Sequence, residues 1–181
     1  MVTLSIDGQK VTVPANSTVL EAAQAAGIHI PTLCYLKDVS QTGACRVCVV
    51  EIGGRLQASC VFPVHEGMVV ETQTPLVRES RRVTVELLLS NHPQDCLTCL
   101  RNQNCELQRL THELNIRDVR FEGARTHVPV DSSSSAIVRD PDKCILCRRC
   151  IGACSDIQGV DVLAARERGF ETVVSPAWQA Q

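Results

Sequence analysis

The chain of 181 residues contains 11 cysteines, and every one of them belongs to one of three short groups. Each group offers four thiol or imidazole donors, the number that an iron–sulfur cluster or a tetrahedral zinc ion takes from protein. The groups are Cys34, Cys45, Cys48 and Cys60, then His92, Cys96, Cys99 and Cys105, and then Cys144, Cys147, Cys150 and Cys154. A random distribution would leave isolated cysteines, so the grouping predicts three metal centres.

The third group has the spacing C-x2-C-x2-C-x3-C, which matches the bacterial ferredoxin run that holds a [4Fe–4S] cluster. Two-residue gaps let a loop follow the cube of the cluster from corner to corner, and a structural zinc site is the alternative. In two-cluster ferredoxins the fourth cysteine of such a run binds the other cluster. Cys154 therefore either completes this centre or leaves the other three cysteines to take a fourth ligand from elsewhere.

The first group, spaced C-x10-C-x2-C-x11-C, predicts a [2Fe–2S] cluster. One close pair of thiolates and two distant ones suit a flat two-iron cluster held between a long loop and a sheet. The first gap is longer than in the plant-type C-x4-C-x2-C spacing. Gly43, just before Cys45, is expected to let the backbone approach the cluster closely. A zinc site that uses Cys45, Cys48 and two other residues is the alternative.

The second group begins with a histidine, in the spacing H-x3-C-x2-C-x5-C. An imidazole in place of one thiolate makes a cluster less negative and is expected to raise its reduction potential, as in Rieske centres. Alone, His92 would be an ordinary histidine that interacts with the dipole at a helix C-terminus. The three cysteines downstream favour His92 as a ligand, whereas His112 and the other histidines have no such neighbours.

Four arginines lie beside or near the expected ligands, namely Arg46, Arg109, Arg148 and Arg149. A cluster bound by thiolates carries net negative charge, so nearby cations can offset its burial and tune its potential. The alternative is that these arginines are ordinary surface residues.

Residues 1–74 are predicted to form a small α+β domain. Asp7-Gly8 and Gly53-Gly54 are typical of hairpin turns between alternating strands, and Thr18 with Glu21 forms a capping box that opens a helix. The strands are expected over 2–6, 10–13, 47–52, 55–59 and 68–72, and the helix over 18–26. A hairpin, a helix across it and further strands resemble the β-grasp layout of plant-type ferredoxins.

Residues 75–118 are predicted to form a helical domain around the second group. Thr74 can cap a helix over 75–91, and Pro93 disfavours helix at the residue before it. A second helix is expected over 105–114 from the period of its leucines. The broad apolar face of the first helix is expected to consist of Leu76, Val77, Val83, Val85, Leu87, Leu88 and Leu89.

Residues 119–181 are predicted to form the third unit. It begins with loop and short strand over 120–143, including a solvated stretch at 131–135 that consists of Asp131 and four serines. The segment from Cys144 to Cys154 should be a loop that runs into a helix, and strands over 162–166 and 170–174 should pair as a hairpin. The tail after Pro176 has no strong pattern.

Composition excludes several classes of function. The net charge is −2, from 18 basic and 20 acidic residues, which gives no strong field for nucleic acid or an anionic membrane. No apolar run approaches the ~18–20 residues of a membrane span, and the start of the chain resembles neither a signal nor a transit peptide. We therefore expect a cytoplasmic protein without membrane insertion, in which cysteines stay reduced and bind metal. There is no glycine-rich G-x-G-x-x-G loop for a nicotinamide or flavin cofactor.

The motifs resemble a known family of iron–sulfur proteins. Residues 31–35 and 43–48, with Cys60, are similar to the accessory-cluster region of [FeFe] hydrogenases, notably NAD(P)-linked ones. They also resemble the large iron–sulfur subunit of complex I and the diaphorase iron–sulfur subunits of NAD-reducing hydrogenases and formate dehydrogenases. Residues 85–105 look like the family's segment of one histidine and three cysteines, and 140–150 look like its next segment.

The resemblance implies a β-grasp, plant-type ferredoxin-like domain, a small helical domain and a bacterial-ferredoxin-like segment. These would hold one [2Fe–2S] cluster and two [4Fe–4S] clusters, the first [4Fe–4S] cluster on the histidine-containing group. It further implies an electron-transfer subunit with no catalytic residue and no substrate-converting site of its own. FMN and NAD(P) are expected on a partner, a flavin-containing NAD(P)H-oxidising subunit.

Other implied partners are a small [2Fe–2S] subunit and a hydrogenase, formate dehydrogenase or ferredoxin-linked catalytic subunit. The family usually continues into a second four-cysteine run and a catalytic or related domain, whereas this sequence ends at Gln181. One alternative is therefore the N-terminal electron-input part of an [FeFe] hydrogenase catalytic subunit whose active domain is absent. A second alternative is a zinc-binding structural module.

Overall fold

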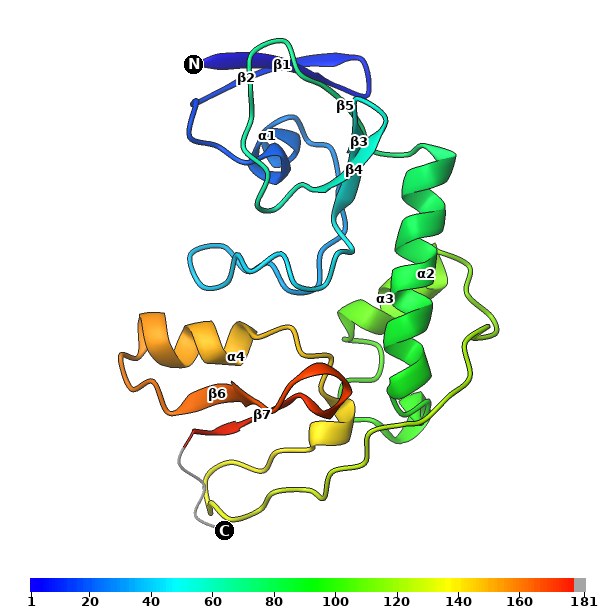
Figure 1. The fold of residues 1–181 in the computed structure, drawn as a ribbon, viewed down its shortest axis with the longest axis vertical. Helices are drawn as coiled ribbons and strands as arrows, with labels where there is room; N and C mark the ends of the chain where they lie inside the picture. The colour runs from blue at the N-terminus through cyan, green and yellow to red at the C-terminus, as the bar shows by residue number, and fades with distance from the viewer. Residues whose placement is uncertain (178–181) are drawn as a thin grey trace.

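The computed structural model describes residues 1–177, and the end of the tail for which the sequence predicts no pattern lies outside the described residues. The fold is a mixed α+β arrangement (Figure 1). A sheet with one helix forms the N-terminal end, the long helix α2 runs down one side, and the C-terminal segments form the opposite end. Within residues 1–177, no helix is both long enough and apolar enough to span a bilayer.

The N-terminal sheet has five strands in the order β2-β1-β5-β3-β4. Strand β1 pairs antiparallel with β2 and parallel with β5, while β3 pairs antiparallel with β4 and with β5. The bounds are β1 Val2–Ile6, β2 Gln9–Val13, β3 Val49–Ile52, β4 Arg55–Ala58 and β5 Val69–Glu71. Both predicted hairpins and the last strand are confirmed, with ends that differ by one or two residues.

Helix α1 (Val19–Ala25) begins at the capping box that the sequence predicts. Glu21 N–H donates to the Thr18 hydroxyl at 3.2 Å, and Thr18 N–H donates to the Glu21 carboxylate at 2.7 Å. These reciprocal bonds satisfy two amide groups that a helix start leaves unpaired. Gly27 follows the last turn with a φ of 72°, a left-handed conformation that glycine adopts without steric cost.

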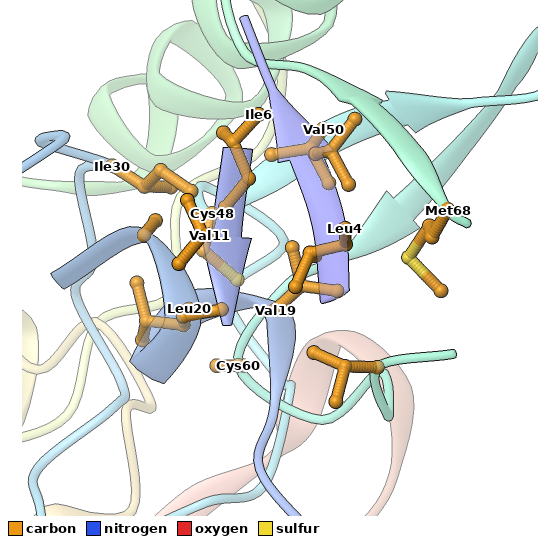
Figure 2. Packing of buried hydrophobic residues seen from close by; sticks show 14 of the residues in the cluster. Leu4, Ile6, Val11, Val19, Leu20, Ile30, Cys48, Val50, Cys60 and Met68 are labelled. Atoms are coloured by element: carbon orange, nitrogen blue, oxygen red, sulfur yellow. The ribbon is translucent and has the colours of Figure 1, made fainter. Parts of the chain in front are cut away.

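The helix packs against the sheet through a dense apolar core (Figure 2). Ile6, Val19 and Leu20 are completely buried, and each such side chain contributes about 1.5–3 kcal/mol relative to an exposed one. Cys48 and Cys60 belong to the same buried cluster. The sheet and α1 therefore form a rigid support that carries two cysteines of the first group.

Helix α2 (Pro75–Asn91) has the predicted bounds, and its cap is confirmed because Val77 N–H donates to the Thr74 hydroxyl at 3.2 Å. The predicted broad apolar face is wrong in part. Leu76 and Leu87 are about half exposed, while Arg81 and Glu86 are buried. On its buried side α2 packs against strand β3. It also faces the segment that follows helix α3 (Glu106–Glu113), where ion pairs take the place of apolar contacts.

Glu86 is the centre of these ion pairs. Its fully buried carboxylate accepts from Arg82 Nε at 2.9 Å and from Arg120 Nε at 2.6 Å, and Arg120 also reaches Glu79 at 3.2 Å. Burial raises the pKa of the Glu86 carboxyl, but the two guanidinium groups outweigh it and hold the pKa below its usual range. The network fastens the segment after helix α3 (Glu106–Glu113) to α2.

The C-terminal part is made of short elements joined by loops. The bounds are η2 Pro141–Lys143, α4 Arg149–Gly152, the π turn η3 Ala153–Ile157, β6 Leu163–Arg166, η4 Gly169–Glu171 and β7 Val173–Pro176. The loop from Cys144 into a helix is confirmed. The predicted strand over 170–174 is displaced, because the turn η4 occupies 169–171 and pairing starts at Arg166 with Val173. Over 120–143 the expected short strand is reduced to a bridge between Asp131 and Arg139.

Candidate metal centres

All four cysteines of the first group are buried and lie together. Side-chain hydrogen bonds link Cys34 to Cys45 and Cys60, and another links Cys48 to Cys60. Cys34 and Cys45 come from the loop between α1 and β3, Cys48 stands just before β3, and Cys60 follows β4. The β3–β4 hairpin thus brings Cys48 and Cys60, which are 12 positions apart in the sequence, next to the loop that carries Cys34 and Cys45. This is the arrangement between a long loop and a sheet that the sequence predicts.

The four thiols polarise one another. Hydrogen bonds with Cys45 and Cys60 lower the pKa of Cys34, and a hydrogen bond with Cys60 lowers the pKa of Cys48 to about 6. The same bonds raise the pKa of Cys45 and Cys60, because these two thiols act as donors, and burial raises both further. Thiolates are the form that binds iron, so the site favours the ligand form at two of its four positions.

The loop around Cys45 uses left-handed backbone. Gly43 has a φ of 62° and Arg46 a φ of 58°, and Cys45 N–H donates to Cys34 Sγ at 3.5 Å. A Cβ atom at residue 43 would lie 3.2 Å from Val61 Cγ2. Glycine is therefore favoured at this position by its φ and by the close approach of Val61.

The four residues of the second group line one cavity of about 200 Å³. His92 is the C-cap of α2, Cys96 and Cys99 belong to the connecting loop, and Cys105 is the N-cap of α3. Leu33, Leu107 and Ile145 contribute apolar wall to the same cavity. The structure thus places all four predicted donors around a common space.

The ring of His92 is held in one tautomer. Its Nδ1 lies 2.7 Å from the Pro93 carbonyl oxygen, and because a carbonyl oxygen only accepts, Nδ1 carries the proton. The Nε2 atom then keeps its lone pair, which is what a metal ligand needs. The sulfur of Cys99 also accepts the N–H of Arg101 at 3.4 Å.

In the third group, Cys144, Cys147 and Cys150 share one environment. Burial raises the pKa of Cys144 and of Cys150, and the charge of Cys147 raises both further, which shows that the three sulfurs are close. Leu146 N–H donates to Cys144 Sγ at 3.4 Å from a left-handed backbone with a φ of 55°. This conformation costs a leucine about 1–2 kcal/mol, a strain that is typical of functional loops.

Cys154 has a different neighbour from the other three cysteines of its group. It lies on the π turn η3, and its sulfur accepts the N–H of Val162 at 3.3 Å. That bond ties the turn to the residue before strand β6. The structure therefore places Cys154 against the C-terminal hairpin.

The donor chemistry fits iron–sulfur clusters. The first group supplies four thiols, the second three thiols and an imidazole, and the third four thiols. Thiolate sets of this kind, with histidine in some centres, are the ligands that hold iron–sulfur clusters in proteins.

One apolar cluster connects the three groups. Leu33, Val47, Val85, Leu107, Leu110 and Ile116 form its buried part, together with Cys34 and Cys45 of the first group. Cys105 of the second group and Cys147 of the third pack against it, as does Ile145. The three groups therefore border the same water-poor interior.

Arg81 is a candidate functional residue that the sequence reasoning missed. Only 3% of it is exposed, and its Nη2 donates to the Val49 carbonyl at 2.7 Å, one residue after Cys48. Burial lowers the pKa of Arg81 to about 10, while the charge of Cys48 favours its protonated form. Its position between Val77 and Val85, at four-residue intervals on α2, is the pattern that could have revealed it.

The four arginines that the sequence singles out have different positions. Arg46 and Arg148 are exposed, and Arg109 pairs with Glu113 one helical turn away at 3.5 Å. Arg149 is partly buried and contacts segments of both other cysteine groups.

Two family models match the chain. Residues 1–75 match a 2Fe-2S iron-sulfur cluster binding domain, and residues 81–120 match the NADH-ubiquinone oxidoreductase-G iron-sulfur binding region. The chain therefore contains a 2Fe-2S domain followed by a 4Fe-4S binding region.

Curated relatives match nearly the whole chain. It is 46% identical over 187 residues to the NADP-reducing hydrogenase subunit HndD of Solidesulfovibrio fructosivorans, and the match covers 99% of this chain and 32% of that protein. It is 37% identical over 172 residues to the mitochondrial NADH-ubiquinone oxidoreductase 78 kDa subunit of Neurospora crassa, covering 93% of this chain and 23% of that protein. The chain thus spans a third or less of the length of these relatives.

A solved structure has the same fold. One chain in a crystal structure of an NAD+-reducing [NiFe]-hydrogenase in the H2-reduced state superposes with a TM-score of 0.92 at 32% sequence identity. The match covers 97% of this chain and 75% of that one.

Proposed function

Because the chain belongs to the family of iron–sulfur proteins that includes the 78 kDa subunit of NADH-ubiquinone oxidoreductase and chains of NAD(P)-linked hydrogenases, we propose that it relays single electrons within an oxidoreductase complex. The observation that carries the proposal is the apolar cluster that all three cysteine groups border. Groups that border one apolar interior are separated by packed side chains rather than by water.

The proposed ligands are the twelve residues of the three groups. Cys34, Cys45, Cys48 and Cys60 would hold a [2Fe–2S] cluster, His92, Cys96, Cys99 and Cys105 a [4Fe–4S] cluster, and Cys144, Cys147, Cys150 and Cys154 a second [4Fe–4S] cluster. The buried, mutually bonded thiols support the first set, and the common cavity supports the second. In the third set, the sulfur of Cys154 accepts a backbone N–H from Val162, as the sulfur of Cys144 does from Leu146. The alternative is that Cys154 serves another centre.

Bound iron–sulfur clusters accept and release one electron at a time, which is the chemistry that they would supply here. The residues of the chain position and tune them. Backbone N–H groups of Cys45, Arg101 and Leu146 point at ligand sulfurs, and such bonds stabilise added negative charge. Leu33 and Ile145 exclude water between the groups. Each transfer oxidises one site and reduces the next by one electron, so no covalent bond forms or breaks in this chain.

The donor and the acceptor of the electrons would be partner subunits. The sequence has no G-x-G-x-x-G loop, so FMN and NAD(P) would be bound by a flavin-containing NAD(P)H-oxidising subunit that splits a two-electron oxidation into single electrons. A small [2Fe–2S] subunit and a hydrogenase or formate dehydrogenase catalytic subunit are the other proposed partners.

The same proposal includes a cytoplasmic location. It also includes the division of the chain into a β-grasp domain at 1–74, a helical domain at 75–118 and a ferredoxin-like segment at 119–181.

A second candidate is that these residues form the electron-input end of a longer catalytic protein. The observation that favours it is that almost the whole of this chain aligns with the hydrogenase subunit HndD, while the aligned part makes up only 32% of HndD. The coding sequence that follows Gln181 separates the two candidates. Further cysteine runs in the same reading frame support the longer protein, and a stop codon followed by a separate catalytic gene supports the subunit.

Anaerobic purification with metal analysis tests the proposal. We expect a brown protein with about ten iron atoms and as many acid-labile sulfides per chain, and an electron paramagnetic resonance signal of a reduced [2Fe–2S] cluster. Cys48→Ser should remove that signal, whereas Cys99→Ser should leave it in place. A colourless, folded protein that contains zinc instead would refute the electron-transfer function in favour of a structural module.

A further inference from the structure

Arg149 belongs to the third cysteine segment, and its guanidinium contacts the other two. Arg149 immediately precedes Cys150 of the third group, and its Nη1 donates to Glu106 Oε2 at 2.7 Å, next to Cys105 of the second group. Its Nη2 donates to the carbonyl oxygen of Tyr35 at 2.9 Å, next to Cys34 of the first group. One side chain therefore joins three segments that lie far apart in the sequence.

The side chain of Arg149 is largely shielded from water, so these hydrogen bonds are not readily replaced by bonds to solvent. Its side chain is 25% exposed, and its Nε is buried without a hydrogen-bond partner among residues 1–177. Burial of a charged nitrogen without a partner is costly, so the two bonds that the guanidinium does make must compensate for it. Hydrogen bonds from a planar guanidinium also fix direction, because its donors form a rigid fork.

A second contact on the same helix brings the third segment against the first. A Cβ atom at Gly152 would overlap the carbonyl oxygen of Val39, so only glycine permits this approach of α4 to the loop after Tyr35. Gly152 is three residues after Arg149 and therefore faces the same side of the helix. Helix α4 is thus seated on the loop of the first group by two independent contacts.

We propose that Arg149 is a positioning residue that holds the three cluster sites at a fixed separation and thereby sets the rate of electron exchange between them. The inference rests on the proposed electron-transfer function. Electron tunnelling falls steeply with distance, so a shift of one segment changes the rate even when every ligand is retained. The exchanged electron oxidises one site and reduces another, and Arg149 itself is not changed.

The neighbouring Arg148 provides a matched control. It carries the same charge, lies between the same two cysteines and is exposed. Within the part of the chain that the structure describes, it does not bridge the three segments. Arg148→Gln therefore removes one positive charge near the third group without the links to Tyr35 and Glu106, which separates the effect of charge from that of position.

The test compares Arg149→Gln, Arg149→Lys and Arg148→Gln with the unaltered protein, each purified anaerobically as the full-length chain with its clusters. Magnetic coupling between reduced centres, measured by electron paramagnetic resonance, reports their separation, and rapid photoreduction with freeze-quenching reports the exchange rate. We expect Arg149→Gln to keep its iron, to change the coupling and to slow exchange several-fold relative to Arg148→Gln, because tunnelling falls steeply as the sites move apart. Arg149→Lys keeps the charge but not the fork and should restore only part of the rate.

The outcomes distinguish the inference from the function on which it rests. Equal coupling and equal rates in Arg149→Gln and Arg148→Gln would overturn the positioning role. If Arg149→Gln loses iron, the milder Glu106→Ala decides, because Glu106 is 47% exposed and its removal breaks only the link to the second group. Coupling in Glu106→Ala identical to that of the unaltered protein would equally overturn the inference. An unaltered protein without iron would refute the proposed function instead.

Discussion

Around the first cysteine group, a five-stranded sheet with a helix packed on it supports Cys48 and Cys60, whereas helix ends, loops and single turns carry the second and third groups. All four cysteines of the first group are buried, while Cys96 and Cys150 are exposed and the rest are partly buried. A sheet supports its ligands through its own core. Loops depend on what they bind, so the two regions should respond differently to the loss of metal.

Removal of iron gives the largest expected contrast. The sheet and α1 keep their own core, so residues 2–13 and 49–71 should retain amide protection after chelation. The segments over 93–105 and 144–154 should lose protection, because metal binding there supplies folding free energy on the order of several kcal/mol. Hydrogen exchange with mass spectrometry measures both regions in one sample. A uniform loss of protection over the whole chain would contradict the contrast.

A pair of leucine truncations separates the two cores. Leu4 and Leu110 are 2% and 1% exposed, and Leu4→Ala and Leu110→Ala should each lower the free energy of unfolding by about 2–5 kcal/mol. Leu110 belongs to the cluster that borders all three groups, so its loss should also reduce iron retention at every centre. Urea unfolding and iron analysis provide the readouts. Equal iron loss in the two variants would show that the cores are not separate.

The Glu86 network tests how firmly the segment after α3 is held to α2. Glu86→Gln should cost about 1.5–3 kcal/mol near pH 7, because it weakens charge-assisted bonds from two arginines. The folded pKa of Glu86 lies below its unfolded value of about 4.3, so its stabilisation is present above that pH and is lost as the pH falls through the folded pKa. Unfolding midpoints of both proteins, measured from pH 8 downward, should differ most at neutral pH and converge in acid. If the difference between the two unfolding midpoints stayed constant with pH, the charge of Glu86 would be excluded as its origin.

The smallest expected effect concerns Arg81 and the first centre alone. Arg81→Met removes a buried cation beside Cys48, so adding an electron to this centre becomes less favourable and its potential should fall. The change should be a small fraction of the ~4 kcal/mol of two charges 4 Å apart at an effective dielectric constant of about 20, because the guanidinium bonds the Val49 carbonyl and not a sulfur. Redox titration followed by electron paramagnetic resonance measures it, with Arg81→Lys as the charge-conserving control. An equal shift at the second or third centre would argue against a local role.

Much of the local structure was predictable from short stretches of the chain. The capping box at Thr18, the helix over 75–91 and the hairpin turns depend on residues a few positions apart. The twelve candidate ligands are likewise encoded in short stretches, because fixed short spacings are needed to wrap one cluster. The hairpin near the C-terminus differs from the sequence pattern, because the connection at Gly169 is longer than the two-residue turn that the sequence indicates.

Other features required contacts between distant segments. No local pattern connects Tyr35, Glu106 and Arg149, and they meet because helix α4 packs on the loop of the first group. The cluster that joins Leu33, Val85 and Ile145 likewise combines three parts of the chain. Ligand identity is encoded in short spacings because one loop wraps one centre, whereas the distances between centres depend on side-chain packing and burial, which are properties of the folded chain as a whole.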